Sequence, residues 1–284
     1  MHVLVAIDGS EESTAALHFL AHLPFTAKPK VTLVTVLVDI ISQEVGLPFG
    51  EPDKAAAEEN MRKAKAFLDA SGFTCDQVIE SGHASRTILD KAKELGIDLI
   101  VLGARGHSAA YRVILGSTAN FIANHARCSV LVVRPNKNPN SNADELNVLL
   151  AYDMSAQARI ALAQMLDFDW PKNAELTLAT FFEKPRLIDE DSVYDAESLS
   201  EANKTLAEVR GQASVNCQIG QVVREAKHIG DGLRDLAAEK EVDLLFLGDT
   251  GKSTIAKFFL GSISSHLLHH SKASVWLARK NEWH

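Results

Sequence analysis

The sequence predicts an α/β protein made of two tandem copies of one doubly wound fold, each with a five-stranded parallel sheet. The main observation is an internal repeat with a constant offset of 145 residues, which indicates two whole domains with almost no insertion. The matched segments are 3–8 with 148–153, 97–103 with 242–248, 115–117 with 260–262, and 129–133 with 274–278. The second observation is that short apolar runs alternate with helical stretches inside each copy.

In the first copy the apolar runs are rich in β-branched residues and are predicted to be strands at 3–7, 31–37, 75–80, 98–103 and 129–134. Because these runs are apolar on both faces, they are typical of strands buried on both sides of a parallel sheet. The helices between them are predicted at 11–23, 53–70, 85–96 and 117–126. Ser10 is expected to cap the first helix, and Gly96 to follow the third.

The second copy repeats this alternation, with strands expected near 147–152, 175–182, 215–222, 242–247 and 273–278. Strands that alternate with helices predict an open sheet with right-handed crossovers. Pro, Asn and Ser cluster between the copies, as is typical of a linker. The predicted domains are therefore 1–135 and 146–284, joined by a linker at 136–145.

Composition and charge narrow the function classes. The chain has 284 residues, of which 46% are hydrophobic and 23% are charged, a profile typical of a globular protein in water. A net charge of −8 argues against nucleic acid as the main partner, because duplex binding depends on Lys and Arg neutralising phosphates. A small anionic ligand stays compatible, since a few backbone N–H groups can hold phosphate.

The cysteines and the N-terminus favour a cytoplasmic location. Cys75, Cys128 and Cys217 share no close spacing, which is typical of a reducing compartment and argues against a thiol-bound zinc ion. The N-terminal apolar run is only a few residues long and has no basic region before it. We interpret it as a strand rather than a signal peptide or a membrane span.

One loop pattern, G-x2-G-x9-G-S, follows the fourth strand in both copies. Its members are Gly103, Gly106, Gly116 and Ser117 in the first copy, and Gly248, Gly251, Gly261 and Ser262 in the second. Glycines after a strand let N–H groups converge on an anion, and a helix that begins at the serine adds donors for phosphate. The alternative is that the glycines only make tight turns. The presence of the whole pattern twice in one register favours a phosphate site.

Asp8 and Asp153 end the first strands of the two copies. Ligands of open α/β sheets bind at the carboxyl ends of the strands, at the switch point in strand order. If the first and fourth strands are neighbours, Asp8 faces Gly103–Gly106 and Asp153 faces Gly248–Gly251. Such a carboxylate could accept hydrogen bonds from a ribose or a base, and the alternative role is to cap the following helix.

These features together resemble the universal stress protein family, and the resemblance covers nearly the whole chain twice. It implies a Rossmann-like fold of the adenine nucleotide alpha hydrolase type, and the branch of the family that binds ATP, here expected with Mg²⁺. The residues implied to hold ATP are Asp8, Val36, Leu37, Gly103, Gly106, Gly116 and Ser117 in the first copy, and Asp153, Gly248, Gly251, Gly261 and Ser262 in the second. We expect Arg105, His107 and Thr118 to contribute to the site of the first copy as well.

The surroundings of the loop differ between the copies, and the first copy is the expected ATP site. It offers three residues suited to phosphates and keeps a glycine after the third strand; these are Arg105, His107, Arg112 and Gly82. The second copy has an acidic residue in the loop, a lysine in place of the glycine, and two aromatic residues at the end of the second strand. These are Asp249, which Lys252 and Lys257 could offset, Lys227, Phe181 and Phe182.

The sequence contains no strong motif for an enzyme or a metal site. No nucleophile elbow, metalloprotease motif or Cys–His pair occurs in the sequence, so no catalytic residue is assigned. The GKS run at 251–253 imitates the end of a Walker A loop, but the first glycine of that motif would fall on Phe246. Histidines share helical faces at His18 and His22, and at His266, His269 and His270. No Cys, Asp or Glu at usable spacing completes a metal site there.

Three hypotheses for function follow. The first is an ATP-binding stress-response or regulatory protein. The second is a slow ATPase or self-phosphorylating protein that uses Ser117 or a neighbour, and the third is a scaffold without nucleotide or a binder of another small ligand. The resemblance also implies dimerisation through the last strand. We expect this pairing inside the chain, as a pseudo-dimer of the two copies, and a further homodimer is left open.

Overall fold

The computed structural model describes residues 1–37, 54–106, 115–135, 146–183, 217–250 and 260–283, with residues 200, 203–205 and 207–208 between them. The predicted linker at 136–145 lies outside the described residues. The chain divides into two compact units. The first unit contains Met1–Ala21, Ala27–Pro135 and Asn281–His284, and the second contains His22–Thr26 and Asn136–Lys280.

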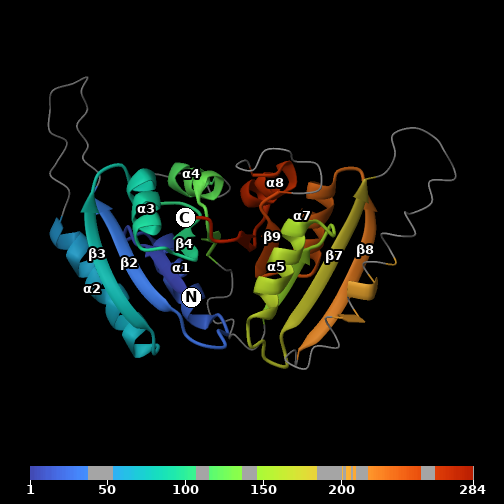
Figure 1. Cartoon of the computed structure of the whole chain (residues 1–284), viewed down its shortest axis with the longest axis horizontal. Coiled ribbons are helices and arrows are strands. Elements are labelled where there is room, and N and C mark those ends of the chain that lie inside the picture. The colour runs from blue at the N-terminus through green and yellow to red at the C-terminus, as the bar shows by residue number, and fades with distance from the viewer. Residues whose placement is uncertain are drawn as a thin grey trace, which may run out of the picture. The chain divides into compact units, whose positions relative to one another are not determined.

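The first unit alternates strands and helices in the predicted order (Figure 1). Its elements are β1 (His2–Ala6), α1 (Glu11–His22), β2 (Lys30–Leu37), α2 (Lys54–Ala70), β3 (Thr74–Ser81), α3 (Ala84–Glu94), β4 (Leu99–Gly103), α4 (Ser117–His125) and β5 (Ser129–Val133). These strands are all parallel and follow the order β3-β2-β1-β4-β5. The predicted α/β fold and parallel sheet are confirmed, with element ends that differ by a residue or two.

The second unit repeats the arrangement. Its elements are β6 (Asn147–Ala151), α5 (Ala156–Leu166), β7 (Glu175–Glu183), β8 (Gln218–Ala226), α7 (Ile229–Glu239), β9 (Leu244–Gly248), α8 (Ser262–His270) and β10 (Ser274–Ala278). The strand order β8-β7-β6-β9-β10 matches that of the first unit. β8 lies several residues later than the predicted 215–222, because it pairs along the whole of β7 up to the Glu183–Ala226 pair.

The strand order reverses direction between β1 and β4, so the carboxyl ends of these two strands form the switch point of the first unit. Right-handed crossovers then place α1 and α2 on one face of the sheet and α3 and α4 on the other. The His18 ring of α1 lies 4.2 Å from the Phe67 ring of α2, in agreement with a shared face. Among the described helices, none has both the length and the apolar character needed to span a membrane.

Two short segments do not follow the predicted domain boundaries, and aromatic side chains explain where each one packs. Phe25 belongs to the second unit, where its ring lies 5.2 Å from that of Phe168. Trp283 belongs to the first unit, where its indole N–H donates to the carbonyl of Ile97 at 2.8 Å. Trp283 is buried and Phe25 is half-buried in the unit to which each is assigned.

Helix ends follow the predicted signals. The Ser10 hydroxyl accepts the N–H of Ser13 at 3.1 Å, so its predicted role as N-cap of α1 is confirmed. After α3, Gly96 adopts a φ of +60°, and the N–H groups of Gly96 and Ile97 bond back to Lys93 and Ala92. This is a Schellman motif, in which glycine takes the left-handed position. The prediction for Gly96 is therefore confirmed.

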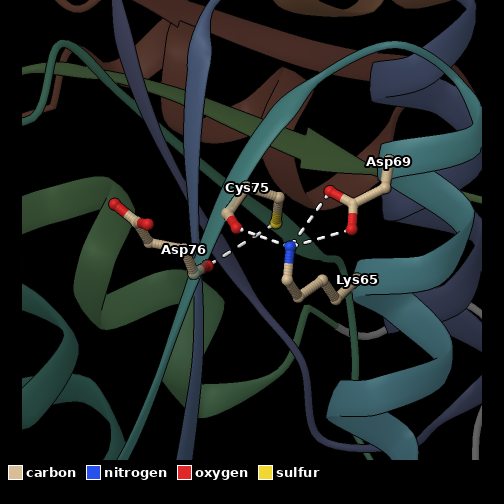
Figure 2. A network of polar contacts seen from close by, with 4 residues as sticks. All are labelled: Lys65, Asp69, Cys75 and Asp76. Carbon is tan, nitrogen blue, oxygen red and sulfur yellow. Dashed lines mark hydrogen bonds and ion pairs between the residues drawn. The ribbon is translucent and has the colours of Figure 1, made fainter.

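A polar network anchors α2 to β3 on the first unit (Figure 2). The ammonium of Lys65 donates to the carbonyl of Cys75 at 2.9 Å and to both carboxylate oxygens of Asp69. The thiol of Cys75 in turn lies 3.5 Å from the carbonyl of Asp76. Burial raises the pKa of the Cys75 thiol to about 11, so the thiol is protonated at neutral pH. The network has a structural role, since it joins the start of β3, where Cys75 is buried, to the C-terminal part of α2.

Candidate functional site

Asp8 and Gly106 meet at the switch point of the first unit. Asp8 follows β1 and Gly106 follows β4, and pairing of these strands brings the two residues together. An ideal Cβ atom at Gly106 would lie 2.6 Å from Oδ2 of Asp8, a distance that real Cβ atoms do not reach. Only glycine fits here without moving the carboxylate. The predicted facing of Asp8 and Gly106 therefore agrees with the structure.

The carboxylate of Asp8 is oriented by the start of α1. Its Oδ1 accepts the backbone N–H of Ser10 at 2.9 Å and the Ser10 hydroxyl at 2.5 Å. Since Ser10 is the N-cap of α1, the capping role that we considered for Asp8 belongs to its neighbour. Asp8 is an exposed side chain, and its second oxygen points to Gly106. A carboxylate held in this way can accept hydrogen bonds from sugar hydroxyls or from a base.

Gly103 has a packing role. A Cβ atom at this position would lie 2.7 Å from Cβ of Glu12 and 2.8–2.9 Å from its backbone carbonyl group. The first turn of α1 therefore sits directly on Gly103, at the end of β4. Gly248 repeats this relationship in the second unit, where its Cβ would lie 2.7 Å from Cβ of Gln157. Close helix packing is sufficient to explain why both positions lack a side chain.

Gly116 closes the loop and begins α4. Its N–H donates to the carbonyl of Ala104 at 2.8 Å, and its own carbonyl accepts the N–H of Asn120. Gly116 is the N-cap residue and provides no side chain to bond the first turn. Ser117 is exposed and Thr118 is half-buried in that turn. The helix thus presents backbone donors, two hydroxyls and the positive end of its dipole at the mouth of the loop.

The charges at this loop include one ion pair that sequence reasoning missed. Arg105 was predicted to contact phosphates, and its guanidinium lies 2.7 Å from the carboxylate of Glu12, with both side chains largely buried. Arg134 lies directly after β5 and is also buried. Burial and the charge of Arg105 lower the pKa of the Arg134 guanidinium. One sequence signal that pointed to charge at this loop was not used: an arginine directly follows the last strand in both copies, at Arg134 and Arg279.

The remaining predicted residues of the first unit lie at the ends of β2 and β3. Val36 and Leu37 are half-buried at the carboxyl end of β2, and the carbonyl of Leu37 accepts the N–H of Gly82 at 3.0 Å. Gly82 adopts a φ of +141°, which favours glycine. β2 lies beside β1 in the sheet, on the side away from β4, and β3 lies beyond β2. His107 and Arg112 lie outside the described residues.

The second unit repeats the frame of the site. The carboxylate of Asp153 accepts the N–H of Ser155 at 3.0 Å, as Asp8 does with Ser10. Gly261 donates its N–H to the carbonyl of Asp249 at 2.6 Å and is the N-cap residue of α8. Ser262 is exposed in the first turn of this helix. Three residues named from the sequence, Gly251, Lys252 and Lys257, lie outside the described residues.

The second unit differs at the other strand ends. A Cβ atom at Gly232 of α7 would lie 2.6 Å from Cε1 of Phe181, so this ring rests against the helix backbone. Lys227 stands where the first unit has Gly82, and it is not among the described non-glycine residues with positive φ. Met154 replaces Gly9 and keeps the left-handed conformation, with a φ of 62°. The strand ends beside Asp153 are therefore built differently from those beside Asp8.

The histidines on α8 have different polar partners. Nε2 of His266 lies 3.2 Å from a carboxylate oxygen of Asp231, and the rings of His266 and His270 are 4.7 Å apart. Nδ1 of His269 instead lies 2.7 Å from the carbonyl of Ser265. Within the described part of the chain, no group of three or more His, Cys, Asp or Glu side chains is arranged to hold a metal ion.

Comparison with known proteins gives one consistent result. The sequence profile described as the universal stress protein family matches residues 1–134 and 146–279. A universal stress protein of Mycolicibacterium smegmatis is 24% identical over 286 residues, which cover 98% of this chain and 96% of that protein. Universal stress protein YxiE of Bacillus subtilis is 30% identical over 144 residues, covering 46% of this chain and 97% of its own. The crystal structure of a universal stress protein from Archaeoglobus fulgidus has a TM-score of 0.70 at 18% identity and covers 98% of both chains.

Proposed function

Since the chain belongs to the universal stress protein family, we propose that its first unit binds ATP at the switch point between β1 and β4. The proposal rests on one observation above all: Oδ2 of Asp8 and the backbone of Gly106 are in contact range at the start of the loop that leads to α4. A carboxylate for the sugar and a glycine-lined approach to a helix N-terminus then lie on the same edge of the sheet.

The adenosine end of the ligand is assigned to the ends of β1 and β2. Two hydrogen bonds to Ser10 restrict the rotation of the Asp8 side chain. It would therefore accept hydrogen bonds from hydroxyl groups with a small loss of side-chain entropy. Val36 and Leu37 offer half-buried apolar surface at the next strand end. The left-handed φ of Gly82 keeps this edge without a side chain.

The phosphate end is assigned to the first turn of α4. Ser117 and Thr118 bring hydroxyl groups there, and the N–H groups of a first helical turn have no partner inside the helix. Arg105 and Arg134 supply two positive charges, of which Arg105 is paired with the carboxylate of Glu12. Mg²⁺ would arrive with the nucleotide, because it prefers phosphate oxygens and water with one or two carboxylates.

ATP occupancy, rather than rapid turnover, is the proposed activity of the protein. No residue of the site has been assigned as a general base, and a phosphate cradle alone gives slow hydrolysis. We place the protein in the cytoplasm, in keeping with the free cysteines Cys75, Cys128 and Cys217. The pseudo-dimer of the two copies and a further homodimer stay predictions.

The test is calorimetric titration of the full chain with ATP and Mg²⁺, beside the variant Gly106→Val. We expect binding near one equivalent, lost in the variant because any Cβ collides with Asp8. Gly220→Ala is the matched control, because a Cβ at Gly220 meets only the carbonyl oxygen of Leu176 at 4.0 Å. Absence of heat in the unmodified chain contradicts the proposal and favours the scaffold hypothesis. Steady phosphate release under the same conditions supports the slow ATPase instead.

A further inference from the structure

The second unit repeats the loop of the first but not its charges. Asp249 stands where the first unit has Ala104, and its Oδ2 lies 3.1 Å from Nε of Arg279. We propose that Asp249 is a built-in anion that neutralises Arg279 and excludes the polyphosphate of a nucleotide from the second unit. This inference rests on the proposed function, because it takes the first unit as the working example of the same site.

Asp249 is fixed at the start of the loop, beside the helix N-terminus. Its backbone carbonyl accepts the N–H of Gly261, the N-cap residue of α8, at 2.6 Å. Its carboxylate is in reach of the Thr250 hydroxyl, at 3.4 Å from Oδ1, in addition to Arg279. The side chains of Arg279 and Asp249 are only 8% and 22% exposed, so water screens their interaction weakly. The carboxylate is thus held at the part of the second unit that matches the proposed phosphate site of the first unit.

Arg279 occupies the same position in the second unit as Arg134 does in the first. It follows β10 directly, as Arg134 follows β5, and the two arginines are separated by the same 145 residues as the rest of the repeat. In the first unit the side chain at the loop position is Ala104, which carries no charge, and the charge of Arg105 acts on Arg134. In the second unit the loop position is a carboxylate paired with the arginine.

The exchange of residues lowers the positive charge that a phosphate would meet. The first unit combines two cations, Arg105 and Arg134, with the carboxylate of Glu12. At the matching positions the second unit has Thr250, Arg279 and Gln157, and adds Asp249. Among the residues that the structure describes at these positions, two cations and one carboxylate have become one cation and one carboxylate; Lys252 and Lys257, which match His107 and Arg112, lie outside them. A polyphosphate at this loop would therefore displace an ion pair and lie beside a fixed like charge.

A second difference at the helix start acts in the same direction. The first turn of α4 contains Thr118, whereas Ile263 occupies the matching position of α8. Isoleucine offers neither a donor nor an acceptor. At this position the second unit therefore offers no hydroxyl to a phosphate, in addition to the internal carboxylate.

The experiment isolates the second unit by blocking the first. A chain with Gly106→Val and Gly116→Val carries side chains where a Cβ would lie 2.6 Å from Asp8 and 3.3 Å from the carbonyl of Ala104. In this background Asp249 is kept, changed to Ala as in the first unit, or changed to Asn. Each protein is titrated with ATP and Mg²⁺ by calorimetry. We expect about one equivalent of binding with either substitution, and an affinity at least tenfold weaker when Asp249 is kept.

Two substitutions guard against loss of the fold. Asp249→Asn keeps an oxygen acceptor near Arg279 and removes only the charge. Asp249→Ala gives the second unit the same two residues, alanine and arginine, that the first unit has at Ala104 and Arg134. Asp235→Asn is the control for net charge, because Asp235 is a largely exposed residue of α7 outside the loop. It should leave the affinity of the second unit for ATP unchanged.

The outcomes separate this inference from the proposed function. If the blocked chain with Asp249 intact binds ATP as tightly as the substituted chains, or if neither substitution creates binding in a folded protein, the role of Asp249 is wrong while ATP binding by the first unit can stand. If the unmodified chain binds no ATP but Asp249→Asn gains one equivalent, the inference stands and the proposed site of the first unit is wrong. If no protein in the set binds ATP, both are wrong.

Discussion

Oδ2 of Asp8 lies 2.6 Å from the position that a Cβ atom would take at Gly106, although the two residues are far apart in the sequence. This contact makes position 106 sensitive to the smallest side chain. A side chain at position 106 is expected to affect ligand binding more than folding stability, because the group that must move is an exposed carboxylate rather than the backbone.

Gly106→Ala is expected to weaken ATP binding without unfolding the protein. The new methyl group displaces the carboxylate of Asp8, which loses its two hydrogen bonds to Ser10 and turns into water at a cost of about 2 kcal/mol. We expect the dissociation constant for ATP to rise at least about tenfold, since the sugar loses an oriented acceptor. Calorimetric titration gives the affinity and thermal unfolding gives the stability. A variant that binds ATP as tightly as the unmodified chain would rule out the assigned role of this contact.

Gly103→Ala is expected to show the opposite balance. Here a Cβ atom would lie 2.7–2.9 Å from Cβ and the backbone carbonyl group of Glu12, which cannot move without shifting α1. We expect a loss of stability of about 2 kcal/mol, as is typical of overpacking. Gly248→Ala should cost a similar amount through Gln157. Denaturant unfolding checks both, and an unchanged midpoint for either variant contradicts the packing role.

The sequence was sufficient to predict the fold because its main signals are local and occur twice. Apolar runs, caps and a constant offset predicted the strands, the helices and the parallel order, and Ser10 and Gly96 act as expected. The switch point followed from one condition, that the first and fourth strands are neighbours, and β1 does pair with β4.

The charges around the loop could not be predicted in the same way. Arg105 was assigned to phosphates from its place in the loop, but its ion pair with Glu12 depends on how α1 packs over β4. The pair between Asp249 and Arg279 likewise joins residues on different elements of the sheet. Sequence position gives the sign of a charge, whereas its partner depends on packing between elements that are distant along the chain.

Glu241→Gly is expected to stabilise the second unit. Glu241 is exposed and adopts a φ of 48° after α7, at the position where the first unit has Gly96 with a φ of 60°. The left-handed conformation costs a residue with a side chain about 1 kcal/mol, and glycine avoids this cost. The free energy of unfolding, measured with denaturant, should rise by about that amount.

The reciprocal change tests whether the backbone is the cause. Gly96→Glu should destabilise the first unit by a similar amount, because no atom lies within 4 Å of a Cβ built at Gly96 and no collision adds to the effect. If Glu241→Gly lowers the stability, side-chain contacts of Glu241 outweigh the backbone conformation and the explanation is wrong.

The Cys75 thiol is expected to make stability depend on pH in alkaline solution. Burial raises its pKa from 9.0 to about 11. Above pH 9 the unfolded chain releases the thiol proton, whereas the folded chain keeps it up to about pH 11. The folded state then binds more protons than the unfolded state, so the free energy of unfolding falls as the pH rises through this window.

Cys75→Ala isolates this contribution from every other group that titrates in the same range. The variant should be less stable than the unmodified chain at pH 8, because it removes a buried sulfur atom from β3. The difference in unfolding free energy between the two proteins should then shrink between pH 9 and pH 11, measured by urea unfolding at fixed ionic strength. A difference that stays constant across this range would mean that the thiol titrates alike in the folded and unfolded chains, and that its burial does not hold the proton.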